Sequence, residues 1–181
     1  MTDRREILEF WFSDQARPRW FVKEPAFDAA IRARFEPTHR AAEAGGLDSW
    51  QDSADGALAL IVVLDQFPRN MHRGTARMFA TDAQARAVAR LATQRGFDLT
   101  TAPDRRVFFY LPFEHSEILA DQELAVALMR ERIGDARQLD FALKHKAIIQ
   151  RFGRFPHRNE ALGRQTTPEE ADFLKGPDSS F

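Results

Sequence analysis

The sequence predicts an all-α fold of seven or eight helices that pack antiparallel on one another. Apolar residues recur at helical spacing along almost all of the 181 residues, and no segment alternates apolar and polar residues as a half-buried strand does. Alanine, the strongest helix former, occurs 27 times. Sixteen phenylalanines can fill much of a core. We therefore expect one helical domain over residues 1–181, with a loose C-terminal tail over residues 175–181.

The first helices are predicted from their caps and their breakers. Asp3 is a suitable N-cap for the first helix, and Pro25 fits the first position of the second. Pro37 should kink or divide that second helix before glycines close it. The segment Ala54–Phe67 is apolar on nearly every side, which indicates a buried central helix, although its eight consecutive apolar residues also suit a buried strand. Pro68 is expected to end it.

The second half of the chain predicts further helices with clear end signals. Thr81 or Asp82 caps a helix through Arg95, and Gly96 stops it. The other helices are expected from about Pro103 to Leu111, from Pro112 to Ile133, from Asp135 to Phe152, and in a short capping-box segment that begins after Thr167.

Composition excludes several classes of protein. The net charge is −1, so no global positive field points to nucleic acid. The absence of cysteine excludes disulfides, thiolate nucleophiles and cysteine-ligated metals. The longest apolar run has eight residues, far fewer than the roughly 20 that a membrane span needs. Glu6 and Glu9 interrupt any signal-peptide core, so we expect a cytoplasmic protein with no membrane partner.

The first polar cluster follows the predicted central helix. Asp65 continues the apolar stripe of Leu58 and Ile61, so its carboxylate should face the core and needs a partner. Arg69 and Asn70 are the candidates. The cluster serves either a ligand or a structural ion pair that fixes the turn.

The second cluster surrounds a histidine on an apolar stripe. His115 continues the stripe of Phe108, and Pro112 leaves a helical carbonyl free nearby. Glu114, His115 and Glu117 together suit either an acid/base group or part of a metal site. The spacing is not that of a His-Glu-x-x-His zinc site, so no metal and no cofactor are predicted. The alternative is a buried histidine whose hydrogen bonds are satisfied internally.

The third cluster is a basic loop after a helix C-terminus. Residues 144–164 contain six basic residues and one acid, a local charge of +5. Arginine forks match carboxylate or phosphate groups. The donors of this loop are Arg154, His157, Arg158, Asn159 and Arg164.

One further histidine precedes this loop. His145 lies on the apolar stripe of Phe141 and Ile148, so it should point inward. The alternative for the basic loop is structural: its arginines would pair with acids elsewhere in the chain. Those acids are Asp65, Glu114 and Glu117.

Four segments carry a resemblance to a known family. They are Ile7–Phe12, Leu64–Asn70, Phe108–Glu117 and Phe152–Arg164. The chain resembles, over about Ile7–Leu174, the mostly bacterial family known as domain of unknown function 924. The resemblance implies an all-helical fold with a tetratricopeptide-like arrangement of helix pairs. It implies no activity.

Two functional hypotheses follow. The first is an inter-helix pocket for a small anionic molecule, with Glu114, His115 and His157 in acid/base roles that suit hydrolytic chemistry. Its ligand-binding residues would be Asp65, Arg69, Asn70, His145, Arg154, Arg158, Asn159 and Arg164. The second is an interaction module that grips an acidic or carboxylate-terminated peptide, for which Trp20 or Trp50 would be exposed. A purely structural network is the third reading. A homodimer is the default assembly if the chain is not monomeric.

Overall fold

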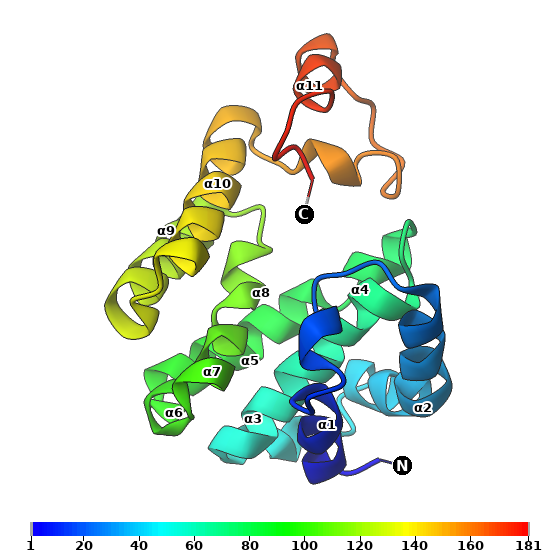
Figure 1. The fold of residues 1–181 in the computed structure, drawn as a ribbon, viewed down its shortest axis with the longest axis vertical. Helices are drawn as coiled ribbons and strands as arrows, with labels where there is room; N and C mark the ends of the chain where they lie inside the picture. Colours follow the sequence, from blue (N-terminus) through cyan, green and yellow to red (C-terminus); the bar gives the residue numbers. More distant parts are fainter. Residues whose placement is uncertain (1, 181) are drawn as a thin grey trace. The chain divides into compact units, whose positions relative to one another are not determined.

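The computed structural model describes residues 2–180, and these form helices without any β-strand, which confirms the all-α prediction (Figure 1). The chain divides into two compact units. Unit 1 comprises Met1–Arg73 and Arg77–Pro112, and unit 2 comprises Gly74–Ala76 and Phe113–Phe181. The single domain expected from the sequence stays a prediction.

Unit 1 is built on caps and apolar stripes close to those that the sequence indicates. Asp3 caps the first helix by accepting a hydrogen bond from the Glu6 backbone N–H at 3.0 Å. The second helix continues through Pro37 and is not divided there. The helices are α1 (Arg4–Trp11), α2 (Pro25–Glu43), α3 (Ala54–Ile61), α4 (Phe67–Met71), α5 (Asp82–Gln94), α6 (Phe97–Thr100) and α7 (Pro103–Arg106). Helix α3 packs against both α1 and α5, and α2 packs against α4.

The central helix continues past the proline that was expected to end it. A π-helical turn over Val62–Gln66 joins α3 to α4, so Pro68 lies in the first turn of α4. Pro68 has no N–H to donate to the Leu64 carbonyl, and the Thr81 hydroxyl donates to that carbonyl at 2.6 Å. The expected end at Pro68 was therefore wrong, because a side chain from elsewhere supplies the missing donor.

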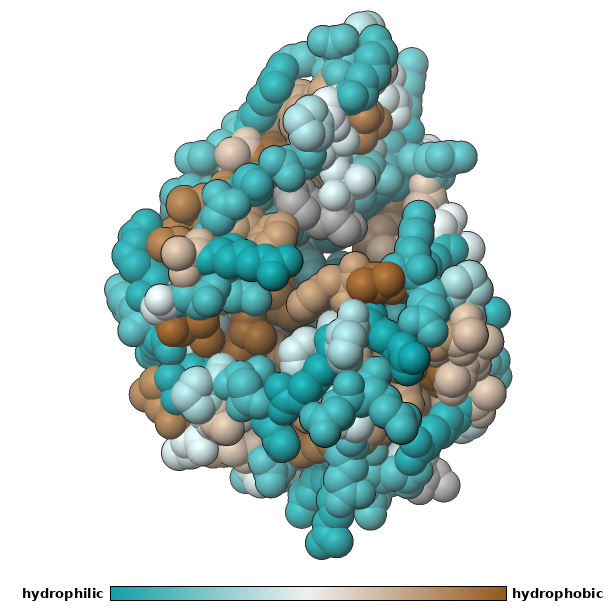
Figure 2. Space-filling view, in the orientation of Figure 1, coloured by the Kyte–Doolittle hydropathy of each residue, from teal (hydrophilic) through white to brown (hydrophobic). Residues whose placement is uncertain are grey.

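Aromatic side chains fill the core of unit 1. Phe35 and Phe67 stack with ring centroids 4.7 Å apart, and Trp20 meets Phe108 edge-on, also at 4.7 Å. The indole N–H of Trp20 donates to the Trp11 carbonyl at 2.7 Å. The face of the molecule in Figure 2 is mainly hydrophilic, with hydrophobic residues in small patches. Most of the phenylalanines thus serve packing, as their number suggests.

The segment expected as one helix from Pro103 to Leu111 is divided. Helix α7 ends at Arg106, a 3₁₀ turn covers Val107–Phe109, and helix α8 (Leu111–Glu114) follows. The Arg106 guanidinium donates to the carbonyls of Asp98 and Thr101, which ties the end of α7 to the segment before it.

Unit 2 centres on a helical hairpin. Helix α9 (Leu119–Leu128) continues as a π-helical turn to Ile133, and Gly134 reverses the chain with a φ of 69°. Helix α10 (Ala136–Phe152) then packs back along α9 (Figure 1). Gly134 and Gly153 both adopt the left-handed conformation that glycine tolerates best.

The helix expected from Pro112 to Ile133 is broken between Glu114 and Leu119. The buried side chain of Gln122 donates to the carbonyls of Glu114 and Ser116, each at 2.6 Å. The Ser116 hydroxyl accepts from the Ile118 N–H at 3.1 Å. Side chains therefore satisfy backbone groups that a continuous helix would pair internally, and these long-range bonds leave no trace in the apolar periodicity.

The C-terminal part of unit 2 follows the predicted signals. Helix α11 (Pro168–Phe173) begins with a capping box between Thr167 and Glu170. Within the tail, the Ser179 hydroxyl donates to the Leu174 carbonyl at 3.3 Å, and Phe181 lies outside the described residues. The tetratricopeptide-like arrangement stays a prediction. No helix over residues 2–180 has the length and apolar character that crossing a bilayer requires.

Candidate functional site

The residues predicted for a site belong to both units. Unit 1 holds Asp65, Arg69 and Asn70. Unit 2 holds Glu114, His115, His145, Arg154, His157, Arg158, Asn159 and Arg164. Each group has its own geometry.

In unit 1, Arg69 is the partner of Asp65 that the sequence indicates. Its Nη1 atom lies 3.2 Å from Asp65 Oδ1 and 2.9 Å from Asp82 Oδ1. Burial alone would lower the pKa of Arg69, but the two carboxylates outweigh it and raise that pKa. Asp65 is fully buried. Because Arg69 contacts both Asp65 and Asp82, it links the π-helical turn to the start of α5. This is a structural role.

Asn70 is directed at a different carboxylate. Its side-chain amide donates to Asp28 Oδ1 at 2.8 Å, and Arg73 binds the same carboxylate through two bonds of 2.6 and 3.1 Å. Asp28 lies on α2, where its sequence position next to a helical apolar stripe gave no sign of this role. The contact fixes α4 on α2.

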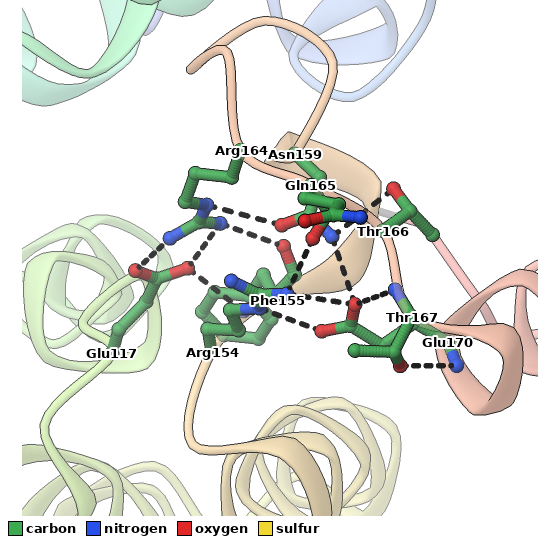
Figure 3. Close-up of polar contacts among 9 residues, drawn as sticks. All are labelled: Glu117, Arg154, Phe155, Asn159, Arg164, Gln165, Thr166, Thr167 and Glu170. Atoms are coloured by element: carbon green, nitrogen blue, oxygen red, sulfur yellow. Dashed lines mark hydrogen bonds and ion pairs between the residues drawn. The ribbon is translucent and has the colours of Figure 1, made fainter.

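In unit 2, Arg164 is held by Glu117 (Figure 3). The guanidinium makes two bonds to the carboxylate, of 2.7 and 2.9 Å, and it also donates to the Phe155 carbonyl. Glu117 in turn accepts from the Phe155 backbone N–H at 2.7 Å. Burial would raise the pKa of Glu117, but Arg164 and this N–H lower it.

Arg154 is held by a carboxylate that the sequence assigns only to a helix cap. Glu170 is buried and accepts two bonds from Arg154, of 2.6 and 2.8 Å (Figure 3). Glu170 also accepts from the Thr167 N–H and from the Asn159 amide. These donors, Arg154 first, lower the pKa of Glu170 to about 2.

These two pairs account for much of the basic loop. Arg154 and Arg164 each face an internal carboxylate, and Asn159 joins the two pairs by donating toward Glu170 and accepting from Arg164. Of the three acids suggested as structural partners of the loop arginines, Glu117 pairs with Arg164. Arg154 pairs with Glu170, which the sequence did not suggest as a partner. An incoming anion would have to compete with these carboxylates for Arg154 and Arg164.

A second group in unit 2, which we call the histidine cluster, surrounds the buried ring of Phe155. It consists of Glu114, His115, His145, His157 and Arg158. The ring centroid of Phe155 lies 5.6 Å from that of His145 and 5.5 Å from that of His157. The Arg158 guanidinium carbon lies 4.5 Å from the same centroid. His115 and His145 are 6.4 Å apart between ring centroids.

The orientation of His145 is fixed from one side. Its Nδ1 atom lies 2.8 Å from the Phe141 carbonyl oxygen and 3.3 Å from Glu114 Oε1. Both neighbours are acceptors, so Nδ1 carries the proton and Nε2 carries the lone pair. Burial lowers the pKa of His145 to about 3, so the ring is neutral at pH 7. The arrangement resembles the orientation of a catalytic imidazole by a carboxylate.

The remaining members of the cluster set its electrostatics. Burial lowers the pKa of His157 to about 4, and the neighbouring charge of Arg158 acts in the same direction. Arg158 is itself buried. Over residues 2–180, no group of three or more histidine, aspartate or glutamate side chains is arranged to hold a metal ion.

Two cavities lie away from all of the predicted residues. A cavity of about 230 Å³ in unit 2 borders the turn between α9 and α10. A larger cavity of about 390 Å³ lies in unit 1 between α1, α3 and α7. The larger one is lined by Arg4, Arg5, Leu8, Glu9, Phe12, Asp55 and Arg105. Sequence reasoning missed it, because its charged residues come from three separate helices and form no local motif.

Comparison with known proteins gives a family but no activity. A family model described as a bacterial protein of unknown function (DUF924) matches residues 7–178. A solved structure of a protein of unknown function from Agrobacterium tumefaciens is 46% identical, with a TM-score of 0.91. The match covers 96% of this chain and 97% of that one. No curated protein matches the chain.

Proposed function

Because the chain belongs to DUF924, a bacterial family of unknown function, we propose from its geometry alone that it binds a small carboxylate or phosphate at the histidine cluster. The observation that carries the proposal is the buried guanidinium of Arg158 beside imidazoles that burial holds neutral. A buried cation next to uncharged rings favours an anion far more than a neutral ligand.

The arrangement of donors supports this choice of ligand. Arg154 and Arg164 face Glu170 and Glu117, whereas Arg158 lies over the Phe155 ring that His145 and His157 also contact. His115 and His157 are only partly buried, so a ligand would reach the cluster from their side.

Beyond binding, we propose that the cluster performs acid/base chemistry. Glu114 orients His145, and the lone pair on Nε2 would accept a proton from a bound molecule or from water. A pKa of about 3 makes His145 a weak base in the free protein. A bound anion would raise that pKa toward neutrality, so the base would become effective only in the complex.

The same reasoning sets the pH dependence of binding. An anion beside His157 favours the protonated ring and raises its pKa from about 4. The complex then holds more protons than the free protein, so affinity should rise as the pH falls from about 7 to about 5.

The experiment is thermal unfolding in the presence of inorganic phosphate, succinate and citrate. An anion at about 100 times its Kd should stabilise the folded chain by roughly 2.7 kcal/mol. Arg158→Ala should abolish that stabilisation, and Arg158→Lys, which keeps the charge, should retain part of it. Arg151→Gln is the matched control, because Arg151 is exposed in the same unit and should leave binding unchanged.

Equal stabilisation of the wild type and of Arg158→Ala would place the anion elsewhere. If no anion stabilises the wild type, the cluster is a structural network. The peptide-binding alternative has less support, since Trp20 packs against Trp11 and Phe108 and donates its indole N–H internally. Stabilisation by acidic peptides but not by small anions would nevertheless favour it.

A further inference from the structure

The larger cavity of unit 1 has the volume and the lining of a ligand site. Its volume of about 390 Å³ falls within the range of small-molecule pockets, roughly 300–1,000 Å³. Buried Leu8 and Phe12 form an apolar surface one and two turns along α1 from Arg4. Asp55 comes from the first turn of α3, and Arg105 comes from α7.

Three arginines border this cavity without an ion pair in the described part of the chain. They are Arg4, Arg5 and Arg105. Arg34, by contrast, forms an ion pair with Glu6 of α1 at 2.7 Å. The Arg105 guanidinium carbon lies 4.8 Å from the Phe12 ring centroid, so this cation is positioned by an aromatic ring and its N–H groups stay available.

The positions of Arg4 and Arg5 strengthen the positive potential. Both lie in the first turn of α1, where the helix dipole already contributes a partial positive charge. Acidic residues stabilise the N-terminal end of a helix, and basic residues there destabilise it. Their placement therefore works against the stability of α1 while it favours an anion in the cavity.

Two carboxylates border the same cavity. Glu9 and Asp55 make no ion pair with any described residue, although the three arginines share the cavity with them. A simple dianion would be attracted by the arginines and repelled by these two groups. A ligand that carries an ammonium as well as an anion satisfies both signs of charge.

We propose that this cavity binds a small zwitterion. Its carboxylate or phosphate would lie on the arginines, its ammonium on Glu9 and Asp55, and its apolar part on Leu8 and Phe12. The site is separate from the histidine cluster of unit 2, so neither proposal depends on the other.

The test is calorimetric titration of the full chain with the twenty proteinogenic amino acids and with phosphoethanolamine. At least one zwitterion should bind with a Kd below about 1 mM. The amide and N-acetyl derivatives of the best amino acid each lack one charge and should bind about tenfold or more weakly. Preference for phosphoethanolamine over every amino acid would identify the anionic group as a phosphate.

Variants place the ligand in the cavity. Arg5→Gln and Glu9→Gln remove one charge of each sign from exposed positions of α1 and should each weaken binding about tenfold. Arg32→Gln, at an exposed position of α2 outside the cavity, should bind as the wild type does.

Three outcomes would overturn the proposal. The first is the absence of binding by every member of the panel. The second is equal binding of the N-acetyl derivative, which would show that the carboxylates take no part. The third is unchanged binding by both α1 variants, which would move the ligand to another place.

Discussion

Thr81 donates its hydroxyl proton to the carbonyl of Leu64, four residues before Pro68, at 2.6 Å. Pro68 has no N–H to give, so a residue at the start of α5 completes the central helix. Because the Thr81 hydroxyl proton is donated to Leu64, the Thr81 oxygen can only accept a hydrogen bond from His39, whose Nε2 lies 3.3 Å away. His39 is therefore protonated on Nε2 when it is neutral.

Thr81→Val should destabilise the protein by about 1–3 kcal/mol, because it keeps the shape of the side chain and leaves two buried polar groups without a partner. Urea unfolding at pH 7 measures the change. Thr93→Val is the control, since the Thr93 hydroxyl bonds only to carbonyls of its own helix. An equal effect of both variants would mean that Pro68 needs no external donor.

His39 should make stability depend on pH. Burial lowers its pKa to about 4, against an ordinary value of 6.5 in the unfolded chain. Between these values the unfolded chain binds more protons, so the stability present above pH 6.5 is lost as the pH falls toward 4. The expected slope for this one histidine is about 1.4 kcal/mol per pH unit.

His39→Gln tests this slope, because glutamine keeps a donor near the position of Nε2 and does not titrate. The free energy of unfolding of the variant should fall less steeply between pH 6.5 and 4.5 than that of the wild type. Parallel curves for the two proteins would show that His39 titrates normally in the folded chain.

The local features of this fold could be predicted from the sequence, whereas the side chains that bond across long sequence distances could not. Asp3, Gly153 and the capping box at Thr167 are correctly predicted, because each acts on residues within one turn of itself. Pro68 misleads, because the donor that rescues its helix is 17 residues from Leu64 in the chain. The spacing of residues along the sequence does not indicate such a contact.

The candidate site shows the same division. The inward direction of His145 follows from helical periodicity, and its burial agrees. The pairing of Arg154 with Glu170 joins residues 16 apart through a loop whose path the sequence does not specify. The cavity beside α1 depends on three helices that meet only in the folded chain.

Glu170→Gln should loosen the end of unit 2. Arg154 and the Thr167 N–H lower the pKa of Glu170 to about 2, so its carboxylate stabilises the fold above its ordinary pKa of 4.5. That contribution is lost as the pH falls from 4.5 toward 2. The hydrogen-exchange protection factors of residues 153–174 should fall in the variant at pH 7, and those of the wild type, corrected for the intrinsic rate at each pH, should fall in the same segment as the pH drops from 4.5 toward 2.

Glu169→Gln is the matched control for that change. Glu169 is the neighbouring residue and pairs with Arg151 at the surface, where an ion pair contributes little. Its exchange rates should match the wild type. Equal acceleration in the two variants would assign the effect to the charge of α11 as a whole rather than to the network of Arg154.

Gln122 should be the most sensitive position in the break between α8 and α9. Its buried amide donates to the carbonyls of Glu114 and Ser116, each at 2.6 Å. Gln122→Leu removes this donor from two buried residues, which should cost about 2–4 kcal/mol in urea unfolding. Gln138→Leu on α10 changes the same side chain where the described structure gives it no bond of its own, and it should cost less than about 0.5 kcal/mol. If the two substitutions cost the same, the break at His115 is held by packing of the apolar residues around it, and the amide of Gln122 is incidental.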